Sequence, residues 1–137
     1  MLTAIKVASL SGVDVRLILP GKPDSKLTYW STLSYLSELM DAGVKVYLYQ
    51  KGFNHSKIIT IDGSFAAIGS ANMDTRSFEH NFEITALFYD EDIASQLEDQ
   101  FRTDMKSSRF MRRHRWEKRN FVRKLFEGLA RLLSPLL

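Results

Sequence analysis

The chain has 137 residues, of which 45% are hydrophobic and 12% aromatic, so it can bury a core and lacks the composition of a disordered chain. Nineteen Lys and Arg against sixteen Asp and Glu give a formal charge of +3, and a sequence without cysteine excludes disulfides, thiolate metal sites and a cysteine nucleophile. The charge is uneven, because residues 1–101 carry eight basic and thirteen acidic side chains, whereas residues 102–137 carry eleven basic and three acidic ones.

The first predicted elements alternate between helix and strand. Residues 2–11 favour a short helix that stops at Gly12, and residues 13–19 are nearly continuous apolar sequence, typical of a buried strand. Residues 44–49 alternate and are rich in β-branched and aromatic types, which predicts another strand. Between these strands, a loop with Pro23 and Asp24 precedes a helix that stops at Gly43, and its apolar residues recur at helical spacing: Trp30, Leu33, Leu36, Leu39 and Met40.

Three short strands are predicted next, at residues 57–61, 65–69 and 82–89. An Asp-Gly pair between the first two is a strong hairpin signal. Residues 90–107 favour a helix whose acidic start suits the positive end of the helix dipole. We expect a second helical stretch, basic and amphipathic, at about residues 109–133.

The order of these elements predicts the α/β fold class, with one mixed β-sheet flanked by helices and basic amphipathic helices at the C-terminal end. Residues 1–108 are expected to form the domain with the sheet, and residues 109–137 the basic helical region. No uncharged run of about 18 apolar residues occurs, so no membrane-spanning helix is expected. The first eight residues lack the basic leader and long apolar stretch of a signal peptide.

One segment has polar residues at a fixed, recognisable spacing. His55-Ser56-Lys57 is followed after four residues by Asp62, and after six more by Gly69-Ser70-Ala71-Asn72. This segment fits the HxKx4Dx6GSxN signature of the phospholipase D superfamily without a gap, and essentially the whole chain resembles the C-terminal half of bacterial cardiolipin synthases. The other segments that carry the resemblance are Gly12-Val13-Asp14-Val15-Arg16, Ala42-Gly43-Val44-Lys45-Val46, Asn72-Met73-Asp74-Thr75-Arg76-Ser77-Phe78, Asn81-Phe82-Glu83, Trp116 and Ser134-Pro135-Leu136-Leu137.

The residue types of the motif suit phosphodiester chemistry. An imidazole such as that of His55 can attack phosphorus or protonate a leaving alkoxide, because it titrates near neutrality. If His55 begins a strand, Lys57 lies on the same face, where its ammonium neutralises charge on phosphate oxygens. Ser70 and Asn72 offer neutral donors at the same two-residue spacing. The resemblance implies that Glu83 is the carboxylate that orients His55, as in other catalytic triads.

Other polar residues have two interpretations each. Asp62 belongs to the motif and counts among the catalytic residues, yet its hairpin position favours support of the loop. His80 has no lysine two residues on, so it either lines the mouth of the pocket or is a solvated loop residue. His114 is expected to be part of a charged face. Arg76 either pairs with Asp74 or binds a lipid headgroup, and the salt bridge with Asp74 is the preferred interpretation. The three histidines have no clustered carboxylates beside them, so neither a metal site nor a cofactor is expected.

The motif occurs once, whereas the resemblance implies a site in which two copies face each other. In that family one histidine becomes a phosphohistidine and the other serves as acid and then base. We therefore expect that a complete site needs a homodimer or a separate half with the first motif. The implied reaction converts two phosphatidylglycerol molecules to cardiolipin and glycerol. The alternatives are an inactive folded fragment of an interrupted gene and a homodimeric nuclease of the phospholipase D type.

Residues 109–137 suit an anionic membrane surface, with Trp116 as the expected interfacial anchor. The alternative is that their apolar stripe packs on the domain's own sheet and only the charges face outward. Arginine beside aromatic residues also fits nucleic acid, but the resemblance favours lipid, and the expected location is the cytoplasmic side of a bacterial cell membrane. The basic residues are Arg109, Arg112, Arg113, Arg115, Lys118, Arg119, Arg123 and Lys124, and the stripe is Val122, Leu125, Phe126, Leu129, Leu132 and Leu133.

Overall fold

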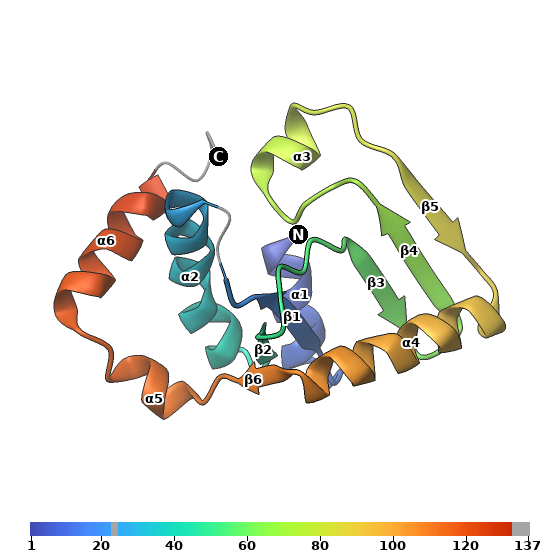
Figure 1. Ribbon diagram of the computed structural model, residues 1–137, viewed down its shortest axis with the longest axis horizontal. Coiled ribbons are helices and arrows are strands. Elements are labelled where there is room, and N and C mark those ends of the chain that lie inside the picture. Colours follow the sequence, from blue (N-terminus) through green and yellow to red (C-terminus); the bar gives the residue numbers. More distant parts are fainter. Residues whose placement is uncertain (23–24, 133–137) are drawn as a thin grey trace.

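The computed structural model describes residues 1–22 and 25–132. Pro23 and Asp24 of the predicted loop, Leu133 of the predicted stripe and the segment Ser134-Pro135-Leu136-Leu137 lie outside the described residues. In chain order the elements are α1 (Leu2–Leu10), β1 (Arg16–Pro20), α2 (Lys26–Asp41), β2 (Lys45–Tyr49), β3 (Ile58–Ile61), β4 (Phe65–Gly69), α3 (Thr75–Glu79), β5 (Thr85–Phe88), α4 (Glu91–Lys106), β6 (Ser108–Phe110), α5 (Arg113–Glu117) and α6 (Phe121–Leu132) (Figure 1).

The strands form two sheets, so the prediction of one sheet was wrong. In the first sheet, β2 lies between β1, which is parallel to it, and β6, which is antiparallel. In the second, β3, β4 and β5 follow one another as antiparallel neighbours. β6 lies in a stretch predicted to be helical; its pairing with β2, far upstream in the chain, overrides the local pattern.

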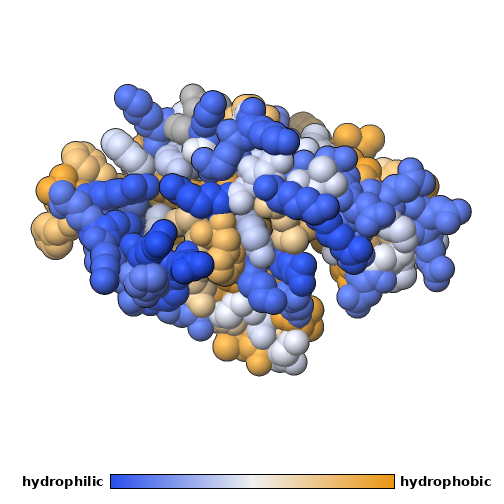
Figure 2. All heavy atoms as spheres, turned by 60° about the horizontal axis from the view of Figure 1, so that its bottom comes forward, coloured by the Kyte–Doolittle hydropathy of each residue, from blue (hydrophilic) through white to orange (hydrophobic). Residues whose placement is uncertain are grey.

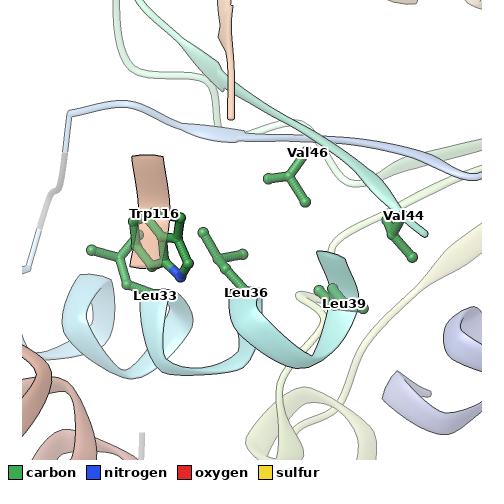
Figure 3. Close-up of a cluster of buried hydrophobic side chains, with 6 residues drawn as sticks. All are labelled: Leu33, Leu36, Leu39, Val44, Val46 and Trp116. Atoms are coloured by element: carbon green, nitrogen blue, oxygen red, sulfur yellow. The ribbon is translucent and has the colours of Figure 1, made fainter. Parts of the chain in front are cut away.

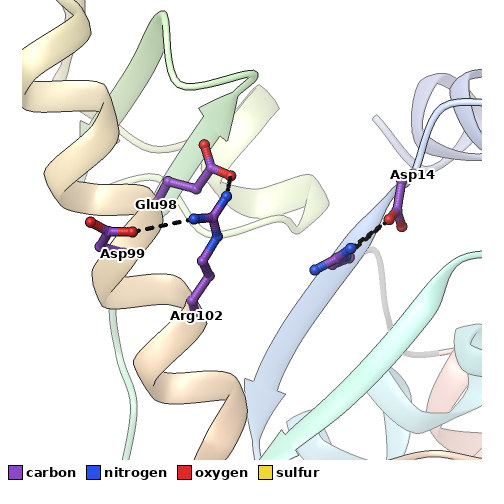
Figure 4. Close-up of polar contacts among 5 residues, drawn as sticks. Asp14, Glu98, Asp99 and Arg102 are labelled. Carbon is purple, nitrogen blue, oxygen red and sulfur yellow. Dashed lines mark hydrogen bonds and ion pairs between the residues drawn. The ribbon is translucent and has the colours of Figure 1, made fainter.

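Helix α4 links the two sheets. It runs along the bottom of Figure 1 and contacts β3 and β4 of one sheet and β2 and β6 of the other. Its outer side carries Arg102, which pairs with Glu98 at 2.7 Å and with Asp99 at 3.4 Å (Figure 4). Exposed pairs of this kind contribute at most about 0.5 kcal/mol each, so the packed side of α4 does most to join the sheets.

The main core lies between α2 and the first sheet. Its buried side chains come from α2, from β2 and the residue before it, and from α5: Leu33, Leu36, Leu39, Val44, Val46 and Trp116 (Figure 3). Trp116 is 5% exposed, and its indole Nε1 donates a hydrogen bond to Ser37 Oγ at 3.1 Å. The prediction that Trp116 anchors the chain at a membrane interface was therefore wrong, because the ring is part of the core.

Short-range signals predicted several boundaries correctly. α1 and α2 stop before Gly12 and Gly43, which have φ angles of +94° and +92°. The β3–β4 hairpin turns at Asp62 and Gly63, both with positive φ (48° and 62°), and Ser64 completes the three-residue loop between the paired residues Ile61 and Phe65. Asp90 caps α4 by accepting a hydrogen bond from the Ile93 N–H at 2.9 Å.

Asp14 ties the parallel strands β1 and β2 together at their starts. Its carboxylate pairs with Arg16 at 2.6 Å and with Lys45 at 2.9 Å, and these two residues lie opposite each other in the pairing of β1 with β2. Asp14 is shown in Figure 4. The hydrogen bond from Arg16, and next that from Lys45, lowers the pKa of Asp14 from 3.8 to about 2. Within the described residues, no helix has the length and apolar character needed to cross a membrane.

Candidate active site

His55 lies in residues 53–57, a segment without regular secondary structure that leads into β3. Its ring is exposed and stacks on Phe53, with ring centroids 5.3 Å apart. The Lys57 ammonium turns back and donates a hydrogen bond to the His55 carbonyl oxygen at 2.9 Å. Because the strand begins only at Ile58, this contact, rather than strand alternation, keeps the ammonium beside His55.

The end of β4 brings the second part of the motif to Lys57. The Gly69 N–H donates to the Lys57 carbonyl oxygen at 3.1 Å. A Cβ at position 69 would lie 2.5 Å from the Ile84 carbonyl oxygen and 2.5 Å from Thr85 Oγ1, so only glycine fits beside β5. The next residue, Ser70, is fixed to the same strand, because its N–H donates to the Ile84 carbonyl at 3.0 Å and its Oγ accepts from the Ile84 N–H at 3.1 Å.

Glu83 accepts hydrogen bonds from the Ser70 hydroxyl and, at 3.1 Å, from Asn81 Nδ2. The bond from Ser70, and then that from Asn81, lowers the pKa of Glu83, and the nearby charge of Lys57 acts in the same direction. The carboxylate is therefore an ionised acceptor. Among the described residues it makes no hydrogen bond to His55, so its expected part in orienting His55 stays a prediction.

Asn81 extends this network, and its role in it was not predicted from the sequence. Arg76 Nε donates to Asn81 Oδ1 at 3.3 Å, so polar contacts run from Arg76 through Asn81 to Glu83 and Ser70. The available signal was the two-residue spacing of Asn81 and Glu83, which places both on one face of an extended segment. Asp74 caps α3 instead of pairing with Arg76, so the expected salt bridge was wrong.

Asn72 lies between β4 and α3 with its side chain exposed. Its backbone N–H donates to the Ser77 hydroxyl at 3.1 Å, and the Ser77 N–H donates to Asp74 Oδ1 at 2.7 Å. The short helix α3 thus holds the backbone of Asn72 in place. Lys57 precedes β3, whereas Ser70 and Asn72 both follow β4, and the pairing of these strands brings the two segments to the same end of the second sheet.

Asp62 lies at the other end of the hairpin from Lys57. The four residues of β3 separate the two, so Asp62 lies five residue steps from Lys57, roughly 16 Å of extended chain, and does not share its surroundings. His80 is exposed at the C-terminal end of α3. His114 is on α5, where it lines a depression with Lys45 and Arg112, apart from the motif.

The motif residues lie on an open surface. His55, Ser70 and Asn72 are exposed, and two shallow surface depressions, one around β6 and α5 and the other beside α6, are lined by other residues. Phe82 and Ile84, on either side of Glu83, are exposed. No group of three or more His, Asp or Glu close enough to hold a metal ion occurs in the part of the chain that the structure describes. The surface therefore offers an ammonium and neutral donors from one side only.

Residues 1–105 match a family model described as cardiolipin synthase, phospholipase D-like domain. The chain is 50% identical over 136 residues to cardiolipin synthase 1 of Staphylococcus epidermidis, and 48% identical over 137 residues to cardiolipin synthase 2 of Bacillus anthracis. These alignments cover 99% and 100% of the chain but 28% and 27% of the relatives. The chain thus spans little more than a quarter of the length of the curated relatives it matches.

Two solved structures share the fold. Nuc, a phospholipase D family member from Salmonella typhimurium, gives a TM-score of 0.70 at 18% identity, covering 81% of this chain and 72% of Nuc. Phosphatidylserine synthase of Haemophilus influenzae Rd KW20 gives a TM-score of 0.71 at 19% identity, and the match covers 98% of this chain and 38% of that enzyme. The predicted phospholipase D-like α/β fold class is confirmed.

Proposed function

Because the chain belongs to the phospholipase D-like cardiolipin synthase family, we propose that it supplies one half of a phosphatidyltransferase site that converts two phosphatidylglycerol molecules to cardiolipin and glycerol. The observation that carries the proposal is the folded motif. The backbone bond from Gly69 to Lys57 and the bond from Ser70 to Glu83 bring its two parts to one surface. A phosphodiester on this surface meets an ammonium and neutral hydrogen-bond donors.

His55 takes one of two parts in the proposed reaction. In the first step a histidine nitrogen bonds to phosphorus, the P–O bond to the glycerol headgroup breaks, and the leaving glycerol oxygen receives a proton. In the second step the primary hydroxyl of another phosphatidylglycerol attacks phosphorus, gives up its proton, and the P–N bond breaks. His55 is either the nucleophile or the proton-transfer group, and the histidine of a second motif supplies the other part.

The remaining motif residues bind and orient. In this proposal Lys57, Ser70 and Asn72 contact the phosphate oxygens. Electrostatic stabilisation of this type is worth about 3 kcal/mol at a transition state. Glu83 is ionised and held by Ser70. In the complete site it accepts a hydrogen bond from the second ring nitrogen of His55 and so orients the ring. Asp62 supports the hairpin that carries Lys57.

A complete site needs a second motif, because the proposed reaction uses two histidines and this chain has one copy of the motif. A second copy of this chain or a separate half with the first motif would supply it. Its substrates are bilayer lipids, so we place the chain at the periphery of a bacterial cell membrane, on the cytoplasmic side.

The test is to incubate the chain with phosphatidylglycerol vesicles, alone and with a first-motif half, and to measure cardiolipin and glycerol. We expect equal amounts of both products, their loss in His55→Ala, and no loss in His114→Ala, a matched control for an exposed histidine outside the motif. Cardiolipin formation that survives His55→Ala refutes the assignment. No product in either mixture indicates the inactive fragment, and His55-dependent cleavage of single-stranded DNA indicates the nuclease.

A further inference from the structure

Helix α6 packs on the rest of the molecule with its polar side inward. Glu127 is 1% exposed and Ala130 2%, whereas Leu125, Leu129 and Leu132 are 53%, 52% and 75% exposed. At about 100° per residue, Leu125 and Leu129 each point about 160° away from Glu127. A surface helix of a globular domain normally buries its apolar stripe. The apolar side of α6 thus lacks a partner in the part of the chain that the structure describes.

Ion pairs hold the polar side of α6 in place. Glu127 accepts from Arg119 at 2.8 Å and from Arg123 at 3.1 Å, and Arg131 pairs with Glu38 of α2 at 2.5 Å. The helix lies mainly against α2. The Arg123 pair lies within α6, whereas Arg119 and Glu38 lie outside it, so the pairs that these two residues form favour the orientation in which the leucines face outward.

The exposed apolar surface continues beyond the three leucines. Phe121 and Val122 are also exposed, and Phe126 reaches Trp30 of α2, with ring centroids 5.3 Å apart. Trp30, Val122 and Phe126 line a shallow depression beside the helix. Figure 2 shows hydrophobic side chains at the left edge of the molecule, the end that α6 occupies in Figure 1.

Unpaired cations accompany this apolar surface. Residues 109–132 contain nine basic and two acidic side chains. Both acidic ones, Glu117 and Glu127, are used in ion pairs with arginines of the same stretch. Among the described residues, five exposed cations of this stretch form no ion pair: Arg109, Arg112, Arg115, Lys118 and Lys124.

We propose that the outward side of α6 docks on the surface of an anionic lipid bilayer. The apolar stripe would lie at the boundary between headgroups and acyl chains, with the five unpaired cations between Arg109 and Lys124 at the headgroups. A symmetric pair of copies joined through this face would bring like charges together, which disfavours a second copy as the occupant. The inference rests on the proposed function in that the same class of lipid is the substrate.

The test measures partition of the full chain onto vesicles of phosphatidylglycerol and of phosphatidylcholine. The His55→Ala background is used throughout, so that binding is read without turnover. We expect Leu125→Ser with Leu129→Ser to lower partition onto phosphatidylglycerol by at least about tenfold. The matched control is Val7→Ser with Leu10→Ser on α1, where both side chains are more exposed than the two leucines of α6, and for it we expect less than a twofold change.

A second pair of variants tests the charges. Lys118→Gln with Lys124→Gln should lower partition by about fivefold for each cation on phosphatidylglycerol and leave phosphatidylcholine partition unchanged. Unchanged partition in the leucine variant overturns the proposal. So does a leucine variant that loses self-association in sedimentation while it keeps its vesicle binding, because a second copy then covers the face. Leucine-dependent vesicle binding by a chain that makes no cardiolipin supports the docking and refutes only the proposed function.

Discussion

Replacing Glu127 by Gln tests how α6 is held. The substitution keeps the shape of the side chain and removes the charge that Arg119 and Arg123 contact at 2.8 and 3.1 Å. Removing one partner of a buried pair costs about 3–5 kcal/mol. The lower end applies, because the Arg123 side chain is 47% exposed and regains water, while Arg119 keeps its bond to the Trp116 carbonyl at 2.8 Å. We therefore expect a loss of about 3 kcal/mol in the free energy of unfolding.

Urea unfolding followed by circular dichroism measures this loss, and thermal unfolding should show a fall in Tm of about 10 °C. Glu117→Gln is the matched control, because Glu117 pairs with Arg113 at 3.0 Å while 57% exposed, and its loss should cost less than about 0.5 kcal/mol. Replacing both Arg119 and Glu127 by Met should recover most of the stability, because no uncompensated charge stays buried. Equal effects of Glu127→Gln and Glu117→Gln would refute the reasoning.

Three further predictions concern the motif and the first sheet. Gly69→Ala should lower the free energy of unfolding by about 1–3 kcal/mol, because the added Cβ meets the start of β5. In the control Gly52→Ala the added Cβ meets open space, so the free energy of unfolding should change by less than about 0.5 kcal/mol, and similar urea midpoints for both variants would contradict this. Ser70→Ala should raise the pKa of Glu83 toward its usual range in an NMR titration, and an unmoved titration would show that Ser70 is not the main cause. The pKa of Asp14 is lowered to about 2, so its contribution to the free energy of unfolding is complete above about pH 4 and is lost as pH falls toward 2. Asp14→Asn should lack this loss in acid, and unfolding free energies of the two proteins that fall in parallel with pH would disprove the prediction.

Local signals made much of the fold predictable. Gly12 and Gly43 end helices, Asp62 and Gly63 lie in the hairpin loop, and Asp90 caps α4. Each of these depends on residues a few positions apart. The division into two sheets and the existence of β6 depend on pairing across long stretches of chain, which alternation along one strand does not reveal.

The candidate site was predictable in its residues and less so in its contacts. The motif spacing identifies His55, Lys57 and Ser70, but the bond from Ser70 to Glu83 depends on the register of β4 against β5, in which Gly69 pairs with Thr85. Amphipathicity poses a similar limit. It shows that α6 has two faces, while the inward face is selected by partners elsewhere in the chain.

The inward polar face of α6 also has a consequence for how this part of the molecule opens. Detachment of α6 would uncover ion pairs and, beyond Ala130 and the Phe126–Trp30 contact, little new apolar area. The free energy of that opening should therefore depend weakly on urea concentration and carry a small heat capacity change. Amides of β2 and β4, in contrast, exchange through openings that expose the packed interior. In native-state hydrogen exchange, α6 would then behave as a separate unit whose protection stays level while that of the sheets falls with added urea.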